Sequence, residues 1–446
     1  MKPLVPLAAL LLAGCASLAP DGGAGAVSTL TQERTGHAVV FQRSAADTEA
    51  ATARVRELLQ QPLSAERAVQ IALLNHRGLQ ARFAELGIVE ADAVGAARPA
   101  GPRLSLGRLA GGGVTEIHRA LSFELLGLLT LPAAGDAARL QVEQAQLQAA
   151  AEAAAVAAEA RRAFYGAVAA RELVGYFEQV QDAADASAEL ARRMQRAGNF
   201  SALAQLREQA FVADAAAGLV RARHQAVVEQ ERLVRALGLP GTSFTLPERL
   251  PDLPAAPIEP ARAEQAALER RLDVRVARRG ADAAAKSLGL VQGTRYVDGV
   301  ELGLVSQGQT GEAGKRGAEV SVGLPLFGGG GVRHARAESL HRQALHQAAA
   351  VELNARSEVR QAYSAYRSAY ELARHYRDEL VPLRKRIADE QLLRYNGMLV
   401  SVFELLADAR EQVQSVSAAV EALRDHWVAE TNLQSALTTG APKEAP

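Results

Sequence analysis

The sequence predicts a mainly helical chain that contributes strands to a transmembrane β-barrel and consists of two tandem helix–β-hairpin–helix–helix repeats. Three observations lead to this fold class. The 446 residues contain one pattern twice, aromatic residues make up only 4% of them, and short alternating strands interrupt long alanine-rich helical stretches. A shortage of large apolar side chains suits elongated helix-on-helix packing better than one compact core.

The repeat is visible in three places. LSAERAVQIALLNH, which begins at Leu63, returns as IEPARAEQAALERR at Ile258, 195 residues later. RAGNFS around Gly198 returns as RYNGMLVS around Gly397, and RALGLP returns as SALTTG. A repeat this long indicates a duplicated structural unit. We therefore expect copies over residues 63–238 and 260–438, a proline-rich linker over 239–259 and a tail over 439–446.

The N-terminus has the pattern of a secretory signal. Lys2 precedes an apolar run that is followed by LAGC, ending at Cys15. Residues 1–14 are too short to span a membrane. LAGC resembles the lipobox of bacterial lipoproteins, which implies that Cys15 is lipidated and begins a tether over residues 15–62 with one short helix. Cys15 is the only cysteine, so it cannot form a disulfide within the chain.

Each copy is expected to contain three helices. In the first copy they cover about 64–98, 133–196 and 201–237, and in the second about 260–292, 332–395 and 401–437. Ser64 is a candidate N-cap, and Pro132 is expected to open the long helix of the first copy. Pro382 should kink the long helix of the second copy. A helix of about 64 residues is ~96 Å long.

Four strands are expected at about 102–109, 114–126, 297–306 and 317–326, each with an apolar and a polar face. They are near the ~9–11 residues that cross a bilayer when tilted. Four strands cannot close a barrel, and an open edge in lipid leaves backbone groups unpaired. Several chains would have to share one barrel, and three would supply twelve strands. A small soluble four-stranded sheet has the same pattern, so the alternation alone leaves both open.

Composition and motifs argue against several other functions. The net charge is zero without a basic cluster, so nucleic acid is not an expected partner. HExxH, CxxC and GxSxG do not occur, and GEAGKRG lacks the spacing and the Ser or Thr of a phosphate loop. We expect no enzymatic activity, no cofactor and no metal site.

The order of the elements, together with LSAERAVQIALLNH, PRLSLG, VGLPLFGGGG and YNGMLVSVFELL, resembles the outer membrane efflux protein (TolC-like) family over about residues 60–438. The resemblance implies a homotrimer whose twelve strands form a barrel in the bacterial outer membrane. A helical barrel of ~100 Å would continue it into the periplasm. It further implies two protein partners, a periplasmic adaptor and an inner-membrane efflux pump.

The resemblance assigns the two helix–helix turns to the periplasmic tip that contacts the adaptor. In this sequence they are Arg196, Gly198, Asn199 and Phe200, and Asn396, Gly397, Met398 and Leu399. The glycines could instead simply cap helices in the left-handed conformation.

The resemblance also implies a periplasmic gate of acidic side chains just after the second turn. Glu404 matches the first acidic position, whereas the second falls on Ala407, with Asp408 one residue on. Three Glu404 side chains near the trimer axis would repel one another and attract cations. A solvated glutamate on a helix face is the alternative.

The expected function is therefore a passive exit duct for cargo that the pump and the adaptor deliver. The alternative is a lipid-anchored periplasmic coiled-coil scaffold without transport activity.

Overall fold

The computed structural model describes residues 19, 21–241, 244–259, 263–325, 328–397, 399–400 and 402–440. The predicted Cys15 and Met398 lie outside these residues. The chain divides into two compact units. The first unit comprises Met1–Val27, Arg82–Ala149 and Leu272–Asn354, and the second comprises Ser28–Ala81, Ala150–Arg271 and Ala355–Pro446.

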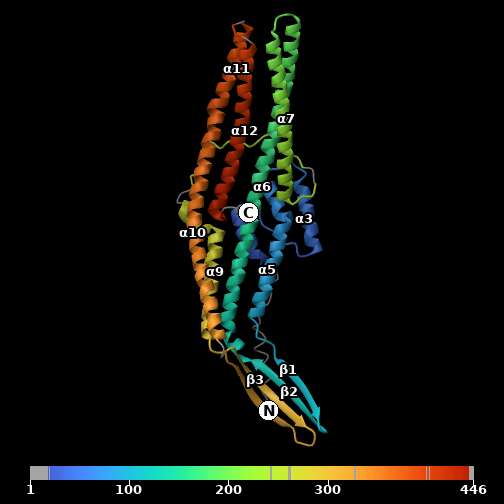
Figure 1. Cartoon of the computed structure of the whole chain (residues 1–446), viewed down its shortest axis with the longest axis vertical. Coiled ribbons are helices and arrows are strands. Elements are labelled where there is room, and N and C mark those ends of the chain that lie inside the picture. The colour runs from blue at the N-terminus through green and yellow to red at the C-terminus, as the bar shows by residue number, and fades with distance from the viewer. Residues whose placement is uncertain are drawn as a thin grey trace. The chain divides into compact units, whose positions relative to one another are not determined.

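The elements follow the predicted order of helices and hairpins (Figure 1). The helices before the first hairpin are α2 (Ala24–Thr35), α3 (Ala45–Leu58), α4 (Ala65–Asn75) and α5 (Arg77–Ala96). Then follow β1 (Arg103–Gly111), β2 (Val114–Glu124), α6 (Leu125–Arg196) and α7 (Ala202–Leu237). The second repeat has α8 (Ala263–Arg270), α9 (Leu272–Gly293), β3 (Gly299–Gln309), β4 (Lys315–Gly323), α10 (Gly329–His375), η1 (Tyr376–Leu380), α11 (Val381–Asn396) and α12 (Val402–Thr438).

In the first unit the two hairpins form one antiparallel sheet in the order β1-β2-β3-β4. Helix α9 is joined to α6 by Arg279 and Glu143, 3.3 Å apart, and to α10 by Arg278 and Glu352, 2.8 Å apart. The four strands and their hairpin pairing agree with the predicted fold class.

The first helix of each repeat is broken, contrary to the expected continuous helices over 64–98 and 260–292. Helix α4 has the predicted N-cap, Ser64, but ends at His76, whose backbone is extended. The break places Asn75 where its Nδ2 donates to the carbonyl of Gly238, 2.6 Å away. In the second repeat the chain breaks at Arg271, whose guanidinium donates to the carbonyl of Ala436. A side chain beside each break thus fastens the C-terminal end of the last helix of its repeat.

Helix α6 begins at Leu125, so the prediction that Pro132 opens it was wrong. The leucine-rich run before Pro132 is helical because leucine is a strong helix former. The carboxylate of Glu124 accepts a hydrogen bond from the N–H of Gly127, which satisfies a free donor at the helix start. The hydroxyl of Thr130 donates to the carbonyl of Leu126 at 2.9 Å.

Near Pro382, where a kink was predicted, the structure has a five-residue π-helical turn, η1, between α10 and α11. The N–H of Val381 donates to the carbonyl of Tyr376, five residues earlier. Pro382 follows directly and has no N–H, so the regular α-helical ladder cannot continue through it.

The main core of the second unit joins helices of both repeats. Buried side chains from α4, α6 and α7, among them Ile71, Phe164 and Leu237, pack together, and Trp427 of α12 lies against them. The Trp427 ring stacks on Tyr165 with ring centroids 5.4 Å apart. Aromatic residues make up only 4% of the chain, and several of them, including Phe164, Tyr165 and Trp427, lie in this core.

The described residues of the proline-rich linker, 239–241 and 244–259, form neither helix nor strand, and they are bonded to helices of both repeats. Leu250 and Leu253 are buried. Arg171 of α6 donates to the carbonyl of Leu246 at 2.8 Å. The indole of Trp427 donates to the carbonyl of Pro251, and the hydroxyl of Tyr370 to that of Pro254, both at 3.1 Å.

The tether contains two helices, α2 and α3, where one short helix was expected. Ser44 and Asp47 cap α3 reciprocally, with the Ser44 side chain accepting from the Asp47 N–H. Arg34 of α2 donates to the carbonyl of Arg270 at 3.1 Å, within the second unit. In the ranges described above, no helix is both long enough and apolar enough to cross a membrane.

Candidate functional site

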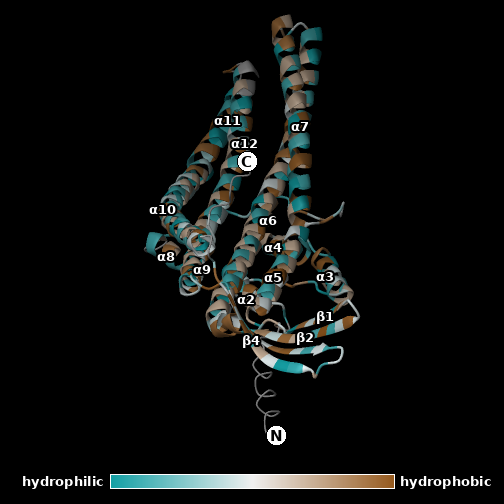
Figure 2. Cartoon of the chain, turned by 60° about the horizontal axis from the view of Figure 1, so that its bottom comes forward, coloured by the Kyte–Doolittle hydropathy of each residue, from teal (hydrophilic) through white to brown (hydrophobic). Residues whose placement is uncertain are grey.

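One face of the sheet in the first unit is mainly apolar, although it also carries Arg108, Arg119 and Arg316, and the other face is mainly polar. The register places Leu104 opposite Leu121, Leu121 opposite Leu304, and Leu304 opposite Ala318, so one row of apolar residues crosses all four strands. Figure 2 shows apolar residues, in brown, recurring along β1 and β2. The larger apolar residues on this face are Leu104, Leu106, Ile117, Leu121, Phe123, Val300, Leu302, Leu304, Val320 and Val322.

Among the residues that the structure describes, much of the apolar face is exposed. Leu106 is 70% exposed, Leu304 62% and Val320 64%. Burying such side chains is worth roughly 1.5–3 kcal/mol each, so a face of this kind favours contact with lipid or with another apolar surface.

The opposite face carries polar side chains that interact with one another. Arg103 of β1 pairs with Glu301 of β3 at 2.7 Å, across β2, and the hydroxyl of Ser122 donates to the same carboxylate at 3.3 Å. The outer edges of β1 and β4 have no strand partner among the described residues. Such edges present free backbone donors and acceptors to an added strand.

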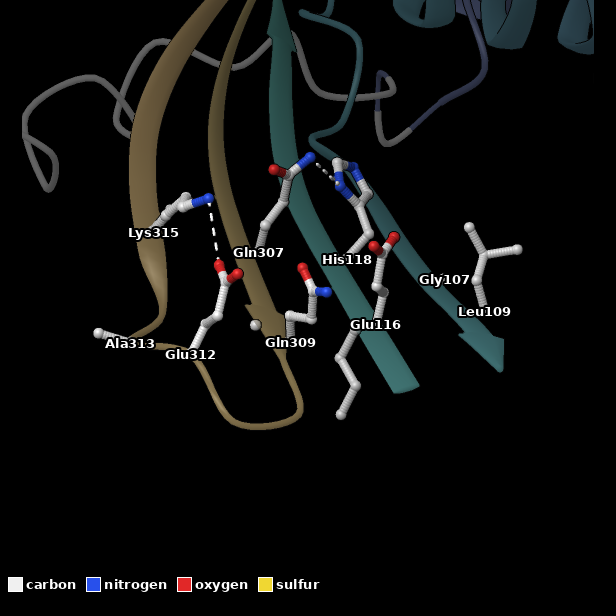
Figure 3. Close-up of a pocket in the computed structure, with 11 residues that line it drawn as sticks. Gly107, Leu109, Glu116, His118, Gln307, Gln309, Glu312, Ala313 and Lys315 are labelled. Atoms are coloured by element: carbon white, nitrogen blue, oxygen red, sulfur yellow. Dashed lines mark hydrogen bonds and ion pairs between the residues drawn. The ribbon is translucent and has the colours of Figure 1, made fainter. Parts of the chain in front are cut away.

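A pocket of about 230 Å³ lies on this sheet near the hairpin ends (Figure 3). Glu116 and His118 of β2 project from the polar face, opposite Gln309 and Gln307 of β3. On the other side of His118 the register places Gly107 of β1, which adds no side chain. Sequence analysis overlooked this group because its members come from two distant segments.

The first predicted tip is the turn between α6 and α7. Gly198 has a φ of 78°, the left-handed conformation expected of a helix-capping glycine. The N–H of Asn199 donates to the carbonyl of Met194 at 2.9 Å, which closes the end of α6. Arg196 is exposed and Phe200 is half-buried. Ser201 caps α7 by accepting from the N–H of Ala204.

The second predicted tip, between α11 and α12, closes by the same kind of backbone bond. The N–H of Leu399 donates to the carbonyl of Arg394, the counterpart of the bond in the first tip. Gly397 has a φ of −78°, so the left-handed cap found at Gly198 does not occur at this glycine. Asn396 and Leu399 are exposed.

The two predicted gate residues lie one helical turn apart at the start of α12. Glu404 is exposed in the first turn, and Asp408 is half-buried. Residues four apart share one face of a helix, so both carboxylates lie on the same side of α12. Ala407, which matches the second acidic position of the family, is exposed.

No protein-family model matches the sequence, and no curated protein matches it. Solved structures do resemble the fold. CusC superposes with a TM-score of 0.72 at 15% identity over 84% of this chain and 92% of that one. The outer membrane protein VceC of Vibrio cholerae has a TM-score of 0.66 at 16% identity over 91% and 98%, respectively. The outer membrane channel MtrE of Neisseria gonorrhoeae has a TM-score of 0.66 at 17% identity over 84% and 88%.

The chain has the fold of these outer membrane channels. The likeness spans both repeats, because each comparison covers more than four fifths of this chain. This finding agrees with the predicted fold class and resemblance.

Within this channel fold, Arg410 connects α12 to α7, which sequence analysis did not foresee. Its guanidinium lies over the ring of Phe211, 4.6 Å from the centroid. It is also 3.9 Å from Glu208, whose buried carboxylate accepts from the hydroxyl of Ser187 at 2.9 Å. Arg410 lies two residues beyond Asp408, so these contacts hold the first turns of α12 against α7.

The channel fold also buries a histidine that sequence analysis did not single out. His426 of α12 is fully buried among the rings of Tyr366, Tyr370 and Trp427, at centroid distances of 5.2–5.6 Å. Burial lowers the pKa of His426 to about 4, because an apolar environment disfavours the charged ring. Burial also raises the pKa of Glu430, whose carboxylate is 3.6 Å from His426 Nε2.

Proposed function

We propose that this protein is a lipid-anchored member of the outer membrane efflux protein (TolC-like) family and acts as the exit duct of a tripartite efflux system. The observation that carries the proposal is the four-stranded sheet with an exposed apolar face, a polar face and two unpaired edges. In a bilayer, unpaired strand edges cost several kcal/mol per group. Three copies that join β4 to the β1 of the next copy would remove every edge and create a twelve-stranded barrel.

In such a barrel the apolar face contacts lipid and the polar face lines water. The paired Arg103 and Glu301 would then lie in the lumen. Signal removal and lipidation at Cys15 would anchor each copy to the outer membrane, with the helices extending into the periplasm. Labelling with a radioactive fatty acid tests the anchor, and a Cys15→Ser variant that still takes up label would contradict it.

The tips would dock a periplasmic adaptor, which links the duct to an inner-membrane pump. The second tip supports this role through Leu399, which is 78% exposed, and the first through the exposed Leu203 and Leu206 of α7. Exposed leucines around a turn are suited to packing against another helical hairpin. The duct itself would be passive, with Glu404 and Asp408 at its periplasmic gate.

A matched pair of arginine substitutions tests the barrel. Leu104 and Ser105 are neighbours on β1 that face opposite sides of the sheet, and Leu104 lies in the row of apolar residues that crosses all four strands. Leu104→Arg places a charge against lipid, which costs up to about 2–4 kcal/mol depending on its depth in the bilayer, and should reduce assembly in the outer membrane. Ser105→Arg should assemble and change the conductance.

The measurements are the oligomeric state in mild detergent and single-channel current in planar bilayers. The wild type and Ser105→Arg should be trimers that conduct. A monomeric wild type, a trimer without conductance, or equal tolerance of both arginines would contradict the proposal.

A further inference from the structure

The pocket at the hairpin end of the sheet combines two side chains suited to metal binding. Glu116 and His118 are two residues apart on β2, which places both on the polar face. In Figure 3 the carboxylate of Glu116 turns toward His118. Imidazole and carboxylate are common ligands of zinc and related ions.

We propose that Glu116 and His118 bind a divalent transition-metal ion such as Zn²⁺ in this pocket. This proposal rests on the proposed function only for the location of the pocket, which would be the lumen of the duct. Metal binding itself requires only the folded sheet. The described residues contain no group of three or more His, Cys, Asp or Glu that could hold a metal. Water and the carboxamide oxygen of Gln309, opposite Glu116, would therefore complete the coordination, which makes the site open and exchangeable.

Gln307 is placed to orient the histidine. Its side-chain amide lies 3.5 Å from His118 Nδ1. If the Gln307 amide is turned so that its oxygen takes the place of its nitrogen, the oxygen accepts a hydrogen bond from His118 Nδ1–H. Nε2 then binds the metal, the arrangement that most metal-binding histidines have. Gly107 leaves the space beside the ring open because it has no side chain. A Cβ at this position would be in van der Waals contact with His118 Cβ, 3.6 Å away.

The charges around the pocket favour a cation. The nearest lysine, Lys315, pairs with Glu312 at 3.4 Å, which offsets its positive charge. Glu116 forms no ion pair with any residue that the structure describes, so its negative charge is available to a ligand.

The test is calorimetric titration of the full chain with ZnCl₂ at pH 7.5, using protein purified without a histidine tag. His118→Ala and Glu116→Gln should each weaken binding by at least about tenfold. Two matched controls should retain it: His346→Ala, an exposed histidine on α10, and Glu319→Gln, on the polar face of β4. Equal binding by wild type and His118→Ala would overturn the proposal.

Two further measurements separate this inference from the proposed function. In the wild type, Zn²⁺ should protect His118 from diethylpyrocarbonate, and unprotected His118 would contradict the site without any variant. In planar bilayers, Zn²⁺ should reduce the current reversibly, with recovery on adding EDTA. A trimer that conducts but does not bind Zn²⁺ overturns the metal site alone. A protein that binds Zn²⁺ through His118 but does not conduct overturns the duct alone.

Discussion

Arg271 and Glu358 form an ion pair inside the second unit, with the guanidinium Nη2 2.5 Å from the carboxylate oxygen. Arg271 is only 1% exposed, and its Nη1 donates to the carbonyl of Ala436 at 3.2 Å. The guanidinium therefore joins the α8–α9 junction to both α10 and α12. The first repeat joins its corresponding helix end with a neutral amide, that of Asn75.

We predict that Arg271→Met lowers the free energy of unfolding by about 3 kcal/mol, because it removes a buried guanidinium that pairs with the half-buried Glu358 and donates to the carbonyl of Ala436. Arg360→Met is the matched control, since Arg360 of α10 pairs with Glu264 of α8 at the surface, 3.1 Å away. That loss should be below about 1 kcal/mol. Denaturant unfolding of both variants gives the comparison, and equal losses would contradict the role of Arg271.

Two left-handed glycines should differ in their tolerance of a side chain. Gly238 and Gly198 have φ values of 66° and 78°, so alanine is strained at both by about 1–2 kcal/mol. A Cβ on Gly238 would also lie 2.9 Å from the carbonyl oxygen of Asn75, whereas one on Gly198 would meet no atom within 4 Å. Gly238→Ala should therefore reduce the melting temperature more than Gly198→Ala. The reverse order would show that the Asn75 contact is unimportant.

The buried His426 should make the second unit sensitive to acid. The pKa of this ring is about 4 in the folded chain, against about 6.5 when unfolded, so the unfolded state takes up a proton first as the pH falls. The stabilisation is complete above pH 6.5 and is lost between about pH 6.5 and 4, by about 3 kcal/mol.

His426→Phe should remove this part of the pH dependence. Melting temperatures measured from pH 7.5 to 4.5 should fall less steeply for His426→Phe than for the wild type. His224→Phe, at an exposed position on α7, is the control and should follow the wild type. Parallel curves for all three proteins would contradict the assignment to His426.

At the proposed gate, Glu404→Ala should increase single-channel conductance or the leak of antibiotics into cells, because it removes three carboxylate side chains that narrow the bore near the trimer axis. Asp408→Ala tests whether the half-buried second carboxylate contributes. Glu421→Ala, at an exposed position further along α12, is the control. An unchanged leak in Glu404→Ala would remove this residue from the gate.

Local signals in the sequence predicted most elements of the fold. Ser64 and Gly238 mark helix ends through capping, and Pro382 marks an interruption through its missing N–H. The helix breaks at His76 and Arg271 could not be predicted, because their hydrogen-bond partners lie more than 160 residues away in the chain. Pro132 misled for a different and local reason, since the carboxylate of Glu124 at the end of β2 accepts a hydrogen bond from the N–H of Gly127 and caps the helix upstream of the proline.

The candidate sites were predictable to different degrees. Turn residues such as Gly198 and Asn396 have a local pattern, and the structure places both at helix ends. Arg410 and His118 acquire their surroundings only when distant strands or helices meet, so spacing along the chain could not single them out. The binding of an adaptor at the tips stays a prediction, and so does the gate at Glu404, which the conductance and leak measurements test.

The proline-rich linker has a mechanical consequence. Its carbonyls are held by Arg171 of the first repeat and by Trp427 and Tyr370 of the second. Because side chains of both repeats bind it, the linker is not free to move between the repeats. If the α6–α7 and α11–α12 helical hairpins separate during transport, we expect the linker to stay in place while the turns at the ends of the hairpins move.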